Sequence, residues 1–159
     1  IAYVQHLDAH GGSIRIRIGS IESGFTMNEK IDKYCVGLQS RVDQIALNLK
    51  TALATLNQDG RTIWGFGAAA KATVMLNYCG IDNSLIKAIA DETPAKIGKY
   101  IPGTGIEVRH PIDWLVAVPD YTCIFAWNYF DAIDRRYADS FHHWRLFTPY
   151  NLEPIKEKV

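Results

Sequence analysis

The 159-residue sequence lacks an excess of charge of either sign, because 17 basic residues balance 17 acidic ones. A nucleic-acid binder needs a basic surface, so this balance argues against nucleic acid as a partner. No apolar run approaches the roughly 18 residues of a membrane-spanning helix, which argues against a membrane role. We therefore expect an ordinary globular protein whose partner is a small molecule.

Cysteine is also scarce. Cys35, Cys79 and Cys123 are odd in number and include no C-x-x-C pair, which argues against a disulfide framework and against a metal site within this chain. Reduced cysteines are typical of the cytoplasm, where we expect the protein to reside. Neither an initiator methionine nor a signal-peptide pattern is present, so we expect a fragment of a longer protein.

The first 60 residues predict a short β segment and a long helix. Isoleucine alternates with arginine over residues 14–18, a strand pattern that we expect to pair with residues 3–7. Residues 1–25 therefore look like the end of a preceding domain. Thr26-Met27-Asn28-Glu29 has the form of a capping box, and apolar residues then recur at steps of three and four, which predicts one connecting helix over residues 26–60.

From residue 61 short apolar runs alternate with helical patterns, which is typical of βαβ units. The predicted fold class is α/β: a Rossmann-like, mostly parallel sheet with flanking helices over residues 61–159, preceded by the long helix and the short β segment. We expect strands near residues 61–65, 85–90, 106–108, 121–126 and 144–148, helices near 68–79, 111–117 and 129–141, and a Pro/Gly-rich loop at 92–105.

One glycine-rich turn, GFGAAAK at residues 65–71, satisfies the G-x-G-x-x-G/A pattern between a strand and a helix. The first glycine permits a sharp turn, the second lets the backbone approach a phosphate, and the helix start offers free N–H groups. Lys71 adds a full positive charge. A tight turn without a ligand is the alternative. We expect the ligand to contact Gly65, Phe66, Gly67, Ala68 and Lys71.

Five further residues could extend this site. Asp91, at the end of the second strand of this domain, could hold a ribose hydroxyl or simply cap a turn. Lys96 and Lys99 could reach a diphosphate or remain solvated. Trp127 could stack or pack, and Asn128 follows a strand at the edge where open α/β sheets bind ligands.

The histidines carry less information. His10, in a glycine-flanked turn, could act as a catalytic base or be an ordinary turn residue. The pair at residues 142–143 is better explained by helix-end charge or packing, since no carboxylate or thiolate stands at ligand spacing. The chain therefore looks more like a binder than a catalyst, and we expect no metal in it.

Several strings together resemble the C-terminal part of the sugar C-methyltransferases of nucleotide-deoxysugar biosynthesis. They are WGFGAAAK at residues 64–71, LNYCGI at 76–81, DETPAKIGKYIPGT at 91–104 and FAWN at 125–128. HGGSIR at residues 10–15 is similar to the segment that ends the methyltransferase domain of that family. Their order and spacing also match.

The resemblance implies a parent enzyme with a zinc-binding region, a domain that binds S-adenosylmethionine, and this C-terminal domain, which helps to hold the nucleotide sugar. In such enzymes a base removes a proton beside a ketone, and the enolate takes the sulfonium methyl group. The zinc, the methyl donor and most catalytic residues would lie upstream, with residues 1–25 ending the methyltransferase domain. We then expect this chain to be inactive alone and to bind no cofactor itself.

Two other functions stay open. The glycine turn and Asp91 would also suit a regulatory module that binds NAD or another nucleotide. Alternatively, the long helix could be a dimer seam in a scaffold domain whose turn is empty.

Overall fold

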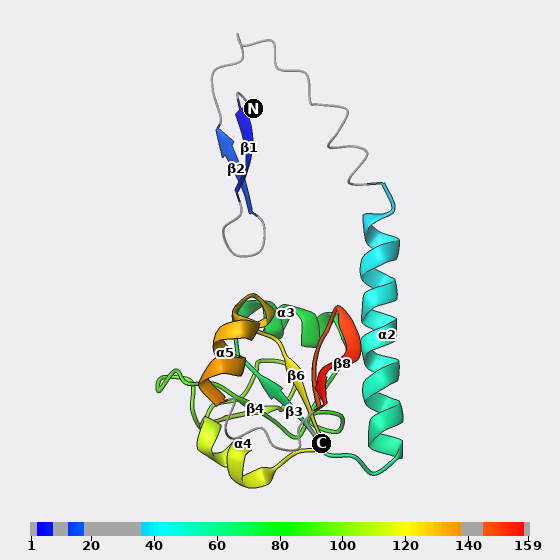
Figure 1. Ribbon diagram of the computed structural model, residues 1–159. Coiled ribbons are helices and arrows are strands. Elements are labelled where there is room, and N and C mark those ends of the chain that lie inside the picture. Colours follow the sequence, from blue (N-terminus) through cyan, green and yellow to red (C-terminus); the bar gives the residue numbers. More distant parts are fainter. Residues whose placement is uncertain (1–2, 8–12, 18–35, 138–144, 158–159) are drawn as a thin grey trace. The chain divides into compact units, whose positions relative to one another are not determined.

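The computed structural model (Figure 1) describes residues 3–7, 13–17, 36–137 and 145–157. The chain divides into two units, residues 1–41 and 42–159, each of which is described by itself. In the first unit β1 (Tyr3–Leu7) pairs antiparallel with β2 (Ser13–Arg17). The pairing that the isoleucine–arginine alternation predicts is therefore confirmed.

The helix labelled α2 (Leu38–Gln58) is shorter than the sequence predicts. Residues 36–37 form a turn in which Gly37 has a φ of +69°, a conformation that cannot continue a right-handed helix. The prediction of one uninterrupted helix from residue 26 is therefore wrong at Gly37, and its capping box at residues 26–29 lies outside the described residues. The predicted end is confirmed: the Gly60 N–H donates to the carbonyl of Asn57 at 3.0 Å.

A six-stranded sheet forms the centre of the second unit, with the order β5-β4-β3-β6-β7-β8. Five strands are parallel, and β8 pairs antiparallel with β7 at the edge. An α/β fold with a mostly parallel sheet is therefore confirmed. The strands are β3 (Ile63–Phe66), β4 (Ala88–Ala90), β5 (Glu107–Arg109), β6 (Tyr121–Ile124), β7 (Arg145–Thr148) and β8 (Asn151–Glu157).

The chain leaves the central strand β3 first toward β4 and β5 and later, on the other side, toward β6 and β7. Doubly wound nucleotide-binding sheets have this strand order, and their ligands lie where it reverses. The sheet departs from that arrangement at the antiparallel β8 and in the β4–β5 connection, which contains no helix. The point of reversal lies between the carboxyl ends of β3 and β6.

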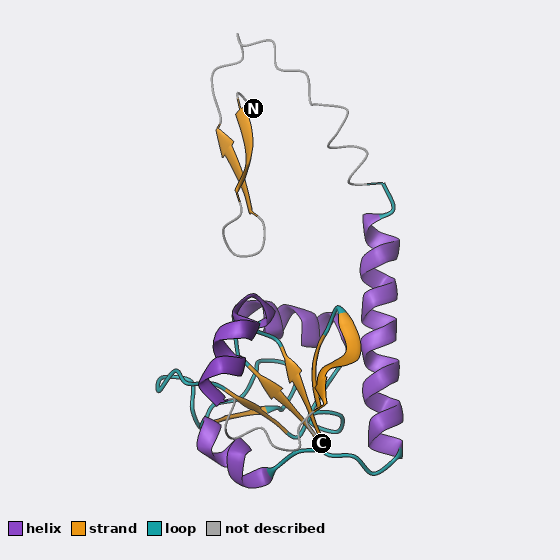
Figure 2. Ribbon diagram, viewed as in Figure 1, coloured by secondary structure: helices purple, strands orange, loops and turns teal. Residues whose placement is uncertain are grey.

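Helices cover both faces of the sheet (Figure 2). They are α2 and α3 (Ala70–Cys79) on one face and α4 (Pro111–Ala117) and α5 (Phe130–Tyr137) on the other. Alternate residues of β3 explain the two layers: Ile63 packs with Leu53 and Leu76 on the first face, and Trp64 packs with Trp114 on the second. A strand that is buried on both faces is typical of parallel sheets.

Apart from α2, the predicted boundaries agree with the observed ones to within about two residues except in the following elements. Strand β4 begins at Ala88 rather than near residue 85, because Asp82 accepts from the Ser84 amide at 2.9 Å and holds a turn there. Strand β8 was not predicted; it contains Pro154, which is tolerated at a sheet edge. The helix predicted for residues 129–141 is described as a 3-10 turn, η2 (Trp127–Tyr129), followed by α5, and its last four residues lie outside the described part.

Candidate functional site

The glycine turn has the strand–turn–helix form that the sequence predicts. Strand β3 ends at Phe66, and the next residue, Gly67, has a φ of +91°, which favours glycine. The Gly67 N–H donates to the carbonyl of Ala90 at 2.7 Å, and the Ala69 N–H donates to the carbonyl of Gly67 at 2.9 Å. These bonds fix the turn between the carboxyl ends of β3 and β4.

Helix α3 begins directly after this turn, at Ala70. Its N-cap is Ala69, whose side chain has no oxygen and makes no capping hydrogen bond. The first N–H groups of a helix have no acceptor within the helix and carry a partial positive charge. The amino end of α3 is therefore suited to an anion.

Lys71, in the first turn of α3, joins this helix end to the segment that follows β6. Its Nζ donates to Oδ1 of Asn128 at 3.2 Å and lies 3.9 Å from the centre of the Trp127 ring. Partial burial lowers the pKa of the Lys71 ammonium group, whereas a π face favours its charged form. The parallel pairing of β3 and β6 explains this grouping, because their carboxyl ends share one edge of the sheet.

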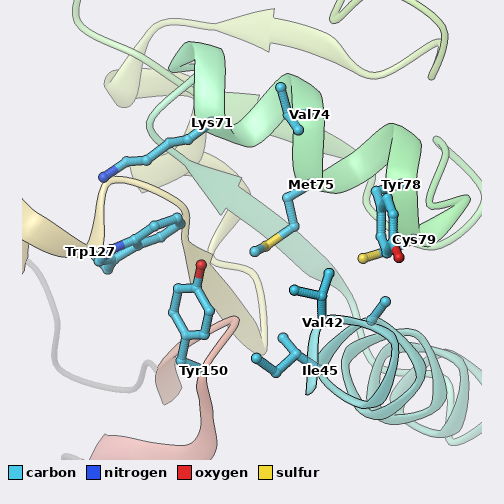
Figure 3. Close-up of a pocket in the computed structure, with 10 residues that line it drawn as sticks. Val42, Ile45, Lys71, Val74, Met75, Tyr78, Cys79, Trp127 and Tyr150 are labelled. Atoms are coloured by element: carbon cyan, nitrogen blue, oxygen red, sulfur yellow. The ribbon is translucent and has the colours of Figure 1, made fainter. Parts of the chain in front are cut away.

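A cavity of about 390 Å³ begins at Lys71 and extends along α3 (Figure 3). Helix α2 closes one side with Val42 and Ile45, and the β7–β8 turn closes another with Tyr150. Most lining side chains are apolar; the set is Val42, Ile45, Ala46, Lys71, Val74, Met75, Tyr78, Cys79, Trp127 and Tyr150. Sequence reasoning did not predict this cavity. An apolar residue on α3, such as Met75, fits the same helical periodicity whether its side chain faces the core or a cavity.

Asp91 lies at the carboxyl end of β4 and is 7% exposed. Its carboxylate accepts from the Thr93 N–H at 2.9 Å and from Lys96 Nζ at 3.1 Å. Burial raises the pKa of Asp91, but the hydrogen bonds from Thr93 and Lys96 outweigh it, so the net pKa is lowered. Asp91 therefore caps a turn in the loop after β4, and ribose binding by it remains a prediction.

Lys96 and Lys99 line a smaller cavity of about 160 Å³, together with Ala68 and Tyr100. Lys96 is thus shared between this cavity and its ion pair with Asp91. Both lysines lie close to the start of α3, as a role beside a phosphate requires, and this role remains a prediction.

The histidines that the sequence analysis considered, His10 and residues 142–143, lie outside the described residues. Among the residues that the structure does describe, no group of three His, Cys, Asp or Glu side chains could hold a metal ion. The same part of the chain contains no helix that is long and apolar enough to span a membrane.

Comparison with known proteins gives the family. The family described as the C-methyltransferase C-terminal domain matches residues 8–146. The chain belongs to this family. The C-methyltransferase C-terminal domain thus includes the glycine turn, Lys71 and the segment around Trp127, all within one matched stretch.

The chain is also similar to C-methyltransferase NovU of Streptomyces niveus. The two are 33% identical over 87 residues, which cover 55% of this chain and 21% of that protein. The match thus spans about a fifth of that relative. Both comparisons agree with the family resemblance in the sequence.

Proposed function

We propose that this domain holds the nucleotide diphosphate of a nucleotide-sugar substrate for an S-adenosylmethionine-dependent C-methyltransferase. One observation supports the proposal above the others: Lys71 is held by Trp127 and Asn128 beside the uncapped amino end of α3. The domain supplies substrate binding to a larger enzyme in the cytoplasm, and it is inactive alone.

Three features of this edge suit a diphosphate. Gly67 has the positive φ that turns the chain sharply from β3 into α3, the first N–H groups of α3 point out of the helix, and Lys71 adds a full charge. The turn also lies where the strand order reverses, between β3 and β6, which is the usual ligand position in open α/β sheets.

The methyl donor suits this site less well than a diphosphate does. S-adenosylmethionine carries its methyl group on a positively charged sulfonium, and the lining of the described cavity includes one cationic side chain, Lys71, and no carboxylate. Two like charges in one cavity repel each other. We therefore assign the donor, and any zinc, to the upstream methyltransferase domain, which is the proposed partner of this one.

No described side chain is assigned as the catalytic base. His10, which sequence reasoning considers for that role, lies outside the described residues. What this domain contributes to catalysis is orientation: anchoring the diphosphate fixes where the sugar can lie, and a fixed reactant is a large part of many enzymatic rate enhancements.

Isothermal titration calorimetry with UDP, TDP and UDP-glucose tests the proposal. We expect Lys71→Gln to weaken binding by roughly 10- to 100-fold, as the loss of a charge-assisted hydrogen bond does. Lys87→Gln is the matched control, because it removes the same charge from an exposed residue. Lys87 lies at the amino end of β4, whereas Lys71 lies near the carboxyl ends of the parallel strands. This control variant should bind like the unmodified chain.

Three outcomes would count against the proposal. One is no binding of any of these ligands by the chain or by a longer protein that includes the upstream domain. Another is an equal loss of affinity in both lysine variants. Tight binding of NAD, without binding of nucleotide sugars, would instead favour a regulatory nucleotide-binding module.

A further inference from the structure

We propose that the 390 Å³ cavity is a subsite for the base of the nucleotide, with Tyr150 and Met75 as its walls. This inference rests on the proposed function, since it needs a ligand that is anchored at Lys71 by its phosphates. It goes further in naming where the ring lies and which residues hold it.

The cavity has the size and lining of a small-molecule site. Ligand cavities commonly measure about 300–1,000 Å³ and are lined mainly by apolar and aromatic side chains. Helix α2 contributes Val42 and Ile45, and α3 contributes Val74 and Met75. Figure 3 shows Met75 and Tyr150 directed toward the same space, with the α2 side chains beyond them.

The charge distribution gives the direction of the ligand. The Lys71 ammonium lies beside Trp127 at one end of the cavity, and the opposite end is formed by Tyr78 and Cys79 of the last turn of α3. The Tyr78 hydroxyl is already occupied, because it donates to the Asp43 carboxylate. A ligand that enters should therefore keep its anionic group at Lys71 and place an apolar or aromatic part along α3.

Tyr150 is the side chain best placed to contact a flat ring. It lies in the tight turn between β7 and β8 and is 56% exposed, although its ring is large and apolar. It meets Trp127 edge-to-face, with ring centres 4.9 Å apart, a contact that favours the observed orientation of the ring. On the other side the Met75 thioether offers the polarizable surface that aromatic rings favour.

The lining predicts how selective this subsite is. Walls with few polar atoms contact the face of a base and not its hydrogen-bonding edge, and stacking of this kind tolerates any base. We therefore expect UDP, TDP and ADP to bind with similar affinity, and inorganic pyrophosphate, which has no ring, to bind more weakly.

The chain contains two methionines, Met27 and Met75, so selective ¹³C-methyl labelling gives two methyl signals in an NMR spectrum. Met75→Leu identifies the signal of Met75. We expect UDP to shift this signal strongly, because an aromatic ring changes the magnetic field at a methyl group that it contacts. Pyrophosphate should leave the signal in place while it still binds at Lys71.

Tyr150→Ala should weaken UDP binding about tenfold, in the range that a stacking contact contributes, and leave pyrophosphate binding unchanged. Tyr129→Ala is the matched control: Tyr129 is 57% exposed, as Tyr150 is 56% exposed, and it does not line the cavity. This control variant should bind both ligands normally.

Three results would overturn the inference while the proposed function stands. They are equal affinities for UDP and pyrophosphate, a Met75 methyl signal that does not shift when UDP is added, and an unchanged UDP affinity in Tyr150→Ala. In that case the cavity accommodates another occupant, such as an apolar side chain of the upstream domain. If neither UDP nor pyrophosphate binds, both the inference and the proposed function fail.

Discussion

Gly67 and Ala126 approach each other so closely that no side chain fits between them: a Cβ placed on Gly67 would lie 2.5 Å from the Cβ of Ala126. Gly67 follows β3 and Ala126 lies just after β6. Their contact therefore lies at the carboxyl ends of these two neighbouring strands, where the strand order reverses. The second glycine of the motif is therefore required by packing as well as by its φ of +91°.

Gly67→Ala should lower the free energy of unfolding by about 1–3 kcal/mol, through backbone strain and through the clash with Ala126. Combining it with Ala126→Gly should restore part of the loss, because the Cβ–Cβ contact disappears while the backbone of residue 126 remains close. Urea denaturation of the two single variants and the double variant measures this coupling. Additive effects in the double variant would contradict the contact.

Nucleotide affinity should depend on pH through Lys71. Burial lowers the pKa of this ammonium group, so it loses its proton at a lower pH than an ordinary lysine, and the attraction to phosphate is lost with it. We expect UDP affinity to fall as the pH rises into the alkaline range. Calorimetry across that range should show the fall in the unmodified chain and in Lys87→Gln, but a flat response in Lys71→Gln.

Asp91 should make stability depend on pH at the acidic end. Its folded-state pKa is lowered, so the stability that it contributes is present above the unfolded-state pKa of about 3.9 and is lost as the pH falls through the folded value. Asp91→Asn should be less stable at neutral pH by about 1–3 kcal/mol and lose less on acidification. Thermal unfolding from neutral to acidic pH tests this, with the exposed Asp59→Asn as control.

Stability should also depend on the hydrogen bond between Trp114 and Thr122. Its Nε1–H donates to the Thr122 hydroxyl at 2.9 Å, and both residues are fully buried. Thr122→Val keeps the shape but leaves the N–H without that acceptor, which should cost about 1–3 kcal/mol of unfolding free energy. Thr122→Ser keeps the hydroxyl and should recover most of the loss. Equal stabilities of the two variants would contradict this account.

Local signals predicted the glycine turn well. Gly67 and the helix after it lie within a few residues, and a strand–turn–helix depends mainly on that local sequence. The grouping of Lys71 with Trp127 and Asn128 is different, because it depends on β3 and β6 being neighbours in the sheet. The sequence placed Trp127 and Asn128 at a strand's carboxyl end, but it did not predict what they contact.

Tyr150 shows why the rest of the site was missed. It follows Thr148 in a turn whose second strand, β8, has an irregular apolar pattern and a proline, so no hairpin was predicted there. The side of the cavity formed by α2 was missed for another reason. Val42 and Ile45 belong to the same apolar stripe as the buried Leu49 and Leu53, and periodicity alone cannot separate core positions from cavity positions.

The double use of α2 limits how the cavity can change. Over its 21 residues the helix contains neither glycine nor proline, so it bends little. Val42 and Ile45 form a wall of the cavity, whereas Leu49 and Leu53 are completely buried in the core. Moving α2 outward to widen the cavity would also pull Leu49 and Leu53 away from the core. We therefore expect this side of the cavity to keep its position. Adaptation to ligands of different size then falls to Tyr150, whose exposed ring can turn without disturbing the sheet.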